Sequence, residues 1–299
     1  MNHDATEKYE VSVIEAQARA DLDIQISTAK HYPRNIQKGF QNALSTVQSS
    51  REIAESCFYT VPRGGKRISG PSVRLAEIMA SNWGNLRVKT TIVDEGRDSV
   101  VCQASCIDLE TNVGVSVEVR RRITTKEGVR YSDDQITLTT NATSSIAFRN
   151  AIFKVIPAVY VQPIYEAART LAVGKESDLD ERRTRCIKYF ESLGVPSTVL
   201  LKHLGKMKAT DIKLDDIEYL LGIQSALKEG DADQDEIFAM TRDGRPMDGT
   251  QADSKPDLND VANAATSRRG RKPKEEQPTP EADAKTEASA PEAEKAPII

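Results

Sequence analysis

The chain has few of the side chains on which metal sites and much enzyme chemistry depend. Its 299 residues include three histidines, four cysteines and one tryptophan, and aromatic residues make up 5% of the total. The cysteines are spread along the chain. Only Cys102 and Cys106 lie close together, and alternation places both on one strand, pointing the same way. These features disfavour a disulfide framework and a zinc site, and they fit a reducing compartment.

Long apolar runs and a leader-like segment are also missing. The apolar stretches are short and interrupted by polar residues, so none supplies the ~20 residues that a transmembrane helix needs. Residues 1–12 lack a basic segment followed by an apolar one, so we expect no secretory signal. The sequence therefore predicts a cytoplasmic protein that does not associate with membranes.

Catalytic motifs are absent as well. The sequence contains no GxSxG, no HExxH and no CxxC pair. The paired acids at 133–134 and 215–216 stand where helices are expected to begin, and carboxylates stabilise a helix N-terminus there. A two-metal nuclease needs several converging acids, and no spacing in the chain indicates them. We therefore expect neither an enzyme nor a bound metal or cofactor.

Charge is distributed unevenly along the chain. The whole chain has a formal net charge of −4, but residues 51–176 hold 17 basic and 14 acidic residues and are the only positive segment. Residues 177–240 hold 9 basic and 13 acidic residues. A partner with negative charge would therefore meet the middle of the chain.

Hydrophobic periodicity divides the chain into four regions. Residues 1–56 carry apolar residues at helical spacing on both sides of Pro33 and are predicted to be helical. Residues 57–176 are predicted to form an α+β core, and residues 177–240 a small helical unit. Residues 241–299 hold seven of the 13 prolines and no aromatic residue, so we expect a disordered, charged tail.

The core region has the period of a β-sheet. Three of its stretches alternate between apolar and polar residues, and they span 88–92, 100–106 and 113–119. Short polar turns connect them, which predicts an antiparallel three-stranded β-meander. A helix over about 133–156 is apolar nearly all round in its second half, so we expect it to pack across this sheet. The predicted fold is thus α+β, a meander packed against a long helix, with flanking helices and a small C-terminal helical unit.

A basic, glycine-containing segment at 62–70 is the first candidate binding site. Its two adjacent glycines allow close backbone approach to a ligand, and a predicted helix follows, whose first N–H groups favour anions. This arrangement suits a phosphate group, and the alternative is a solvated surface loop. The residues concerned are Arg63, Gly64, Gly65, Lys66, Arg67 and, on the following helix, Arg74.

Three consecutive arginines at 120–122 form the second candidate. Alternation sends Arg120 and Arg122 to the polar face of the predicted sheet and Arg121 toward the apolar face or the strand end. The two outward arginines suit contacts to a nucleic-acid backbone that are independent of base sequence. The alternative is an edge strand whose charges prevent aggregation.

Two cations on the predicted long helix are further candidates. Arg149 shares a face with apolar residues, so it suits a buried ion pair, for example with Glu118, as well as a ligand contact. Lys154 follows near the end of the same helix.

The order of these elements resembles the single-strand annealing protein superfamily, which includes the eukaryotic annealing recombinase and the phage Erf-like annealases. The segments that carry the resemblance are 65–70, 73–79, 83–85, 87–124 and 142–157. In this family a basic groove formed by the sheet and its neighbouring helices holds DNA, and subunits assemble in rings or filaments. The resemblance therefore implies single-stranded DNA and further copies of the chain as partners.

The resemblance also implies a function. We expect ATP-independent binding of single-stranded DNA and annealing of complementary strands in phage homologous recombination, within the host cytoplasm. A nuclease or the host single-strand-binding protein would be a further partner. By position, the DNA contacts would come from Arg63, Lys66, Arg67, Arg74, Arg120, Arg122, Arg149 and Lys154.

Two alternatives stay open. One is a passive single-strand-binding protein whose acidic tail, at 275–299, recruits partners. The other is an enzyme that processes nucleic acid. Because aromatic residues are scarce, binding should depend mostly on phosphate contacts and fall steeply with salt.

Overall fold

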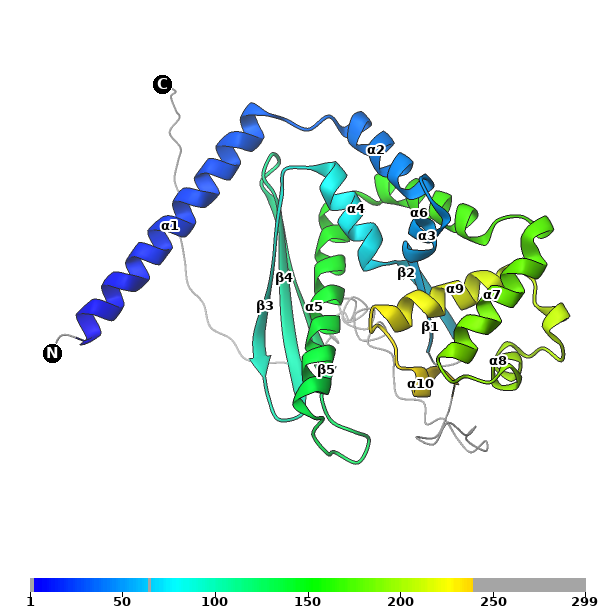
Figure 1. Cartoon of the computed structure of the whole chain (residues 1–299). Coiled ribbons are helices and arrows are strands. Elements are labelled where there is room, and N and C mark those ends of the chain that lie inside the picture. Colours follow the sequence, from blue (N-terminus) through cyan, green and yellow to red (C-terminus); the bar gives the residue numbers. More distant parts are fainter. Residues whose placement is uncertain (1–2, 64–65, 239–299) are drawn as a thin grey trace, which may run out of the picture. The chain divides into compact units, whose positions relative to one another are not determined.

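The computed structural model of the chain describes residues 3–63 and 66–238 (Figure 1). The predicted tail at 241–299 lies outside the described residues, as do Gly64 and Gly65 of the basic segment. The described residues form a mixed α+β fold, as predicted.

Three helices open the chain, in agreement with the helical prediction for residues 1–56. They are α1 (His3–His31), α2 (Ile36–Gln48) and α3 (Arg51–Ser56). The break between α1 and α2 contains Pro33. Asn35 caps α2, because its side-chain oxygen accepts a hydrogen bond of 2.9 Å from the Lys38 N–H.

The predicted meander and long helix are confirmed. Strands β3 (Leu86–Glu95), β4 (Ser99–Asp108) and β5 (Val113–Arg122) pair antiparallel in that order. Helix α5 (Asp133–Val155) runs along one face of this sheet (Figure 1). The alternate residues of β4 that face α5 are buried, which explains why one face of each strand is apolar.

The basic segment belongs to two strands, which the sequence analysis did not predict. Strands β1 (Phe58–Arg63) and β2 (Lys66–Pro71) pair antiparallel into a separate two-stranded hairpin, and α4 (Val73–Trp83) follows it. Prolines and glycines in these strands are typical of loops. Proline is tolerated in a strand at positions where no neighbouring strand needs a backbone N–H as a hydrogen-bond donor.

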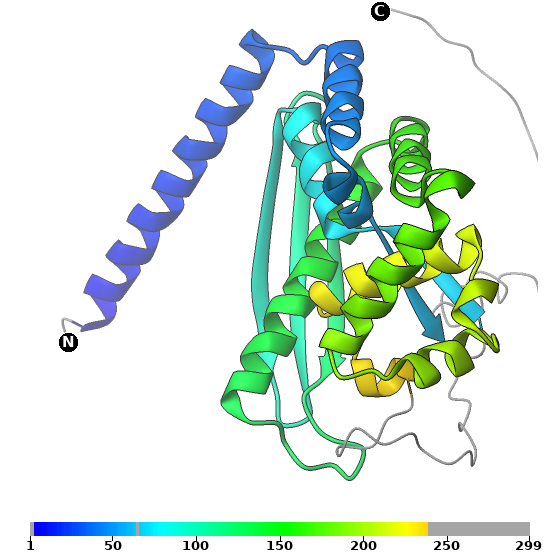
Figure 2. The ribbon, with the colours of Figure 1, turned by 45° about the vertical axis from the view of Figure 1, so that its right-hand side comes forward.

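Seven further elements complete the described chain. They are α6 (Ala158–Val173), η1 (Glu176–Asp178), α7 (Leu179–Ser192), α8 (Ser197–Leu204), η2 (Ala209–Asp211), α9 (Leu214–Lys228) and α10 (Gln234–Phe238). Helix α9 packs directly on β1, and Figure 2 shows it in yellow beside the blue and cyan strands of the hairpin. The predicted helical unit is therefore in contact with the β1–β2 hairpin.

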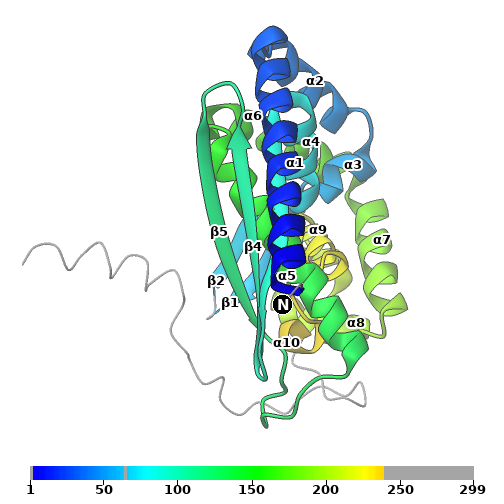
Figure 3. The same ribbon diagram turned by 90° about the vertical axis from the view of Figure 1, so that its left-hand side faces the viewer.

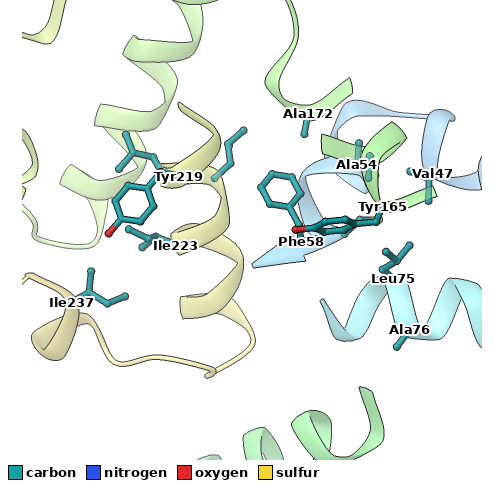
Figure 4. Packing of buried hydrophobic residues seen from close by; sticks show 14 of the residues in the cluster. Val47, Ala54, Phe58, Leu75, Ala76, Tyr165, Ala172, Tyr219, Ile223 and Ile237 are labelled. Carbon is teal, nitrogen blue, oxygen red and sulfur yellow. The ribbon is translucent and has the colours of Figure 1, made fainter. Parts of the chain in front are cut away.

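The described residues share one continuous hydrophobic core. Figure 4 shows Phe58 of β1 against Tyr165 of α6, and Tyr219 and Ile223 of α9 near Ile237. Phe58, Tyr165 and Ile223 are all at most 7% exposed. Burial of such side chains supplies most of the stabilisation of a small fold.

The contact between α9 and β1 depends on a glycine. A Cβ atom at Gly222 would lie 2.3 Å from the Thr60 hydroxyl oxygen and 2.9 Å from the Thr60 backbone nitrogen. Thr60 itself is 3% exposed, and its hydroxyl is hydrogen-bonded to that of Ser69 at 2.8 Å. The helix can therefore approach the strand this closely only without a side chain at position 222.

Replacing Gly222 by alanine should lower the free energy of unfolding by about 1–3 kcal/mol, because the added methyl overpacks the contact with the strand backbone. Urea unfolding followed by circular dichroism would measure this loss. Gly114→Ala is the matched control, since its Cβ would meet only the Ile107 side chain at 3.5 Å and the Cys106 carbonyl at 4.0 Å. A Gly222→Ala protein as stable as the control would contradict the packing argument.

Candidate nucleic-acid interface

The face of the sheet turned away from α5 is polar and cationic. Along β5, exposed residues alternate with half-buried valines, and the valines face α5. Arg120 and Arg122 are exposed on the outer face, as alternation predicted. Figure 3 shows their strand β5 next to β4. Arg121 points the other way and is half-buried.

Strand β3 adds two cations that the sequence analysis did not single out. Lys89 pairs with Ser105, which pairs with Ser116 of β5, and Arg87 lies two residues earlier on the same face. Lys89 is exposed, and Arg87 Nη1 donates a long hydrogen bond of 3.4 Å to Gln25 of α1. Because Arg87 and Lys89 flank the apolar Val88 on a predicted strand, alternation could have placed both on the polar face of the sheet.

Two acids share this outer face. Glu118 lies two residues before Arg120 on β5 and accepts a hydrogen bond of 3.1 Å from Gln103. Asp94 lies in the same cross-strand row as Arg120. With Arg87, Lys89, Arg120 and Arg122 the face keeps an excess of two positive charges.

Arg121, near the end of β5, contacts the segment that follows α9. The half-buried Arg121 donates a hydrogen bond from Nη1 to the Gly230 carbonyl oxygen. Burial lowers the pKa of Arg121 from its ordinary value, Asp231 opposes this shift, and the positive charge of Arg63 adds to it. Arg63 is therefore within electrostatic reach of β5, and Lys66 is its cross-strand partner.

We group the four cations of the outer sheet face with Arg63 and Lys66 of the hairpin, which lies on the α5 side of the sheet (Figure 1), and call the six the basic surface. Arg63 and Lys66 are exposed, as are three of the four sheet cations, and Arg87 is half-buried. The members of the basic surface are Arg63, Lys66, Arg87, Lys89, Arg120 and Arg122.

Arg67 lies on the opposite side of the hairpin. It pairs with Pro62, whose side chain points away from the side that carries Arg63 and Lys66. The guanidinium carbon of Arg67 lies 4.0 Å from the centroid of the Tyr219 ring on α9. Arg67 is exposed nonetheless.

Arg74 is engaged by two carboxylates. Its guanidinium contacts Glu77 at 3.0 Å and Glu229 at 2.9 Å. The hydrogen bond to Glu229 raises the pKa of Arg74 most, burial opposes it, and Glu77 adds to the rise. Its charge is thus balanced within the chain, so we leave Arg74 out of the basic surface.

Arg149 is buried and paired within the chain, so its role is structural. Its side chain is 9% exposed, it forms an ion pair of 2.7 Å with Asp231, and its guanidinium carbon lies 4.4 Å from the Tyr59 ring centroid. The partner is therefore Asp231 and not Glu118, which lies on the outer face of the sheet. Lys154 is exposed in the last turn of α5 and is not part of the basic surface.

Within 3–63 and 66–238, no three His, Cys, Asp or Glu side chains converge as a metal site would require. Burial raises the pKa of the Cys106 thiol to about 11, so it stays protonated at neutral pH. None of the described helices combines the length and apolar character needed to cross a lipid bilayer.

Comparison with known proteins does not name a relative. No family model, no curated protein and no solved structure matches the chain. We therefore infer the function from the geometry of the basic surface and from the resemblance seen in the sequence.

Proposed function

We propose that the chain binds single-stranded DNA along the basic surface and anneals complementary strands without ATP. The observation that carries this proposal is the outer sheet face, where cations from two strands lie exposed, while α5 covers the other face. Cations spread over a regular strand spacing suit a phosphate backbone.

The composition of the outer face favours annealing over capture of bases. None of the strands β3, β4 and β5 contains an aromatic residue. A strand held on this face by its phosphates would therefore keep its bases free for pairing, because stacking on aromatic rings is what retains bases elsewhere. Neutralised phosphates would also repel an incoming complementary strand less strongly.

The face carries neutral hydrogen-bond donors between the cations. Thr91, Gln103, Ser105 and Ser116 lie in adjacent cross-strand rows. Hydroxyl and amide groups of this kind bind phosphate and sugar oxygens without reading base sequence. The proposal therefore includes recognition of the backbone with little preference for sequence.

The partners belong to the same proposal. A ring or filament of identical chains would join several basic surfaces into one long track, which the family resemblance implies. A nuclease or host single-strand-binding protein would deliver or receive the strand.

The test mixes the full-length protein with two complementary dye-labelled strands, without ATP or metal, and follows pairing at low and moderate salt. We expect pairing faster than in the protein-free control, and we expect the gain to shrink as salt rises. A variant with Arg120 and Arg122 replaced by glutamine should lose most of the acceleration. Binding without acceleration would indicate a passive single-strand-binding protein, and the absence of binding would refute the nucleic-acid proposal.

A further inference from the structure

Arg67 and Tyr219 form a layered pair between the hairpin and α9. The guanidinium carbon lies 4.0 Å from the ring centroid, a distance typical of a cation stacked on an aromatic face. Tyr219 is 5% exposed, whereas Arg67 is exposed. The ring covers one side of the Arg67 guanidinium. The remainder of the Arg67 side chain accounts for its exposure.

The ring beneath Arg67 is held from two sides. The Tyr219 hydroxyl shares a hydrogen bond of 2.8 Å with His203 Nε2 on α8, and the two rings are stacked with an interplanar angle of 3°. The His203 and Phe238 rings pack in a T-shaped arrangement, with their centroids 5.1 Å apart, and Phe238 belongs to α10. Three helices therefore fix the plane on which Arg67 lies.

No carboxylate of the described residues pairs with Arg67. Within the described residues no acidic oxygen lies within ion-pair distance of it, whereas Arg74 and Arg149 each have a carboxylate partner. Burial lowers the pKa of His203, and the charge of Arg67 lowers it further, so the imidazole stays neutral at neutral pH and does not repel the guanidinium. The Arg67 guanidinium is therefore cationic, supported by the Tyr219 ring and exposed, without a carboxylate partner among the described residues.

We propose that Arg67, supported by the Tyr219 ring beneath it, is a stacking platform for one unpaired nucleobase of a bound single strand. This inference rests on the proposed function and adds a base contact to the phosphate contacts of the basic surface. Guanidinium planes stack on bases in single-stranded recognition, and a plane fixed in advance loses less entropy on binding. The strand would pass around the edge of the hairpin to reach Lys66 and Arg63, whose side chains lie on its other side.

The experiment compares two oligonucleotides of about 12 nucleotides, one of thymidines and one of the same length made of abasic deoxyribose phosphates. Both carry the same phosphates, so a difference in affinity reports contacts to bases. We expect the full-length protein to bind the thymidine strand about tenfold more tightly, within the range for one stacked base. Arg67→Lys keeps the charge and removes the plane, so it should lose most of this preference while the salt dependence stays unchanged.

Two further variants separate stacking from loss of fold. Tyr219→Phe keeps the ring and gives up only the hydrogen bond to His203, so the preference for bases should persist. Arg19→Lys, an equal change at an exposed position of α1, should behave as the unmodified protein. Thermal unfolding of each variant checks that the protein remains folded.

The outcomes distinguish this inference from the function on which it rests. Equal affinity for both oligonucleotides in the unmodified protein, or an undiminished preference in Arg67→Lys, would overturn the platform and leave phosphate binding intact. Failure to bind either oligonucleotide would overturn both.

Discussion

Single-stranded DNA is expected to bind about 10²–10³-fold more weakly at about 0.1 M salt once four cations of the basic surface are replaced by glutamine. The four positions are Arg63, Lys66, Arg120 and Arg122. Each phosphate contact on a single strand contributes about 0.7 to the slope of log affinity against log salt, so the slope should fall by about 3. Fluorescence anisotropy of a labelled oligonucleotide across a salt series measures both quantities.

The matched control changes net charge equally at positions outside the basic surface. Lys30, Lys38, Lys175 and Lys188 are exposed on α1, α2, the α6–η1 connection and α7. Replacing these four by glutamine should leave the slope nearly unchanged. If both sets lowered affinity and slope to the same extent, binding would follow net charge alone, and the basic surface would not be the site.

The sheet and its covering helix could be predicted because their periodicities are strong. Valines at every second position of β5 marked a half-buried strand, and the apolar second half of α5 marked a helix packed on it. The hairpin could not be predicted in the same way. Pro62 and Gly70 lie inside its strands, and residues of these types usually mark loops.

The residues of the candidate site also differ in how far the sequence predicts their positions and partners. Arg120 and Arg122 could be placed from local alternation alone, because a strand fixes which face each residue takes. The partners of Arg74 and Arg149 could not, since Glu229 and Asp231 lie 155 and 82 residues away in the sequence. Sequence spacing does not show which ion pairs form by tertiary packing. A buried or paired arginine therefore cannot be distinguished from an exposed one in the sequence alone.

Arg34 is a further case of an arginine that sequence reasoning missed. It follows Pro33 in the break between α1 and α2, and its side chain is 6% exposed. Its Nη1–H donates to Asp108 at 2.7 Å, its Nε–H donates to Glu110 at 2.9 Å, and its guanidinium carbon lies 5.0 Å from the Trp83 ring centroid. One cation thus ties the N-terminal helices to α4 and to the turn between β4 and β5.

Arg34→Met is expected to lower the free energy of unfolding by about 3–5 kcal/mol. Methionine fills a similar volume but leaves the Asp108 carboxylate, which is also 6% exposed in its side chain, without its cation. An unpaired buried charge costs far more than the pair contributes, so the effect should exceed that of any exposed ion pair. Urea unfolding of both proteins under identical salt measures the difference.

Arg130→Met supplies the comparison that makes this result decisive. Arg130 also forms an ion pair, with Glu95 at 2.9 Å, but the two side chains are 40% and 47% exposed. Water can solvate the remaining carboxylate there, so the loss should stay at or below about 1 kcal/mol. Equal losses in the two variants would mean that burial of the Arg34 cluster does not set its energy. A much larger loss in Arg34→Met would show that burial of the Arg34 cluster sets the energy of its ion pairs.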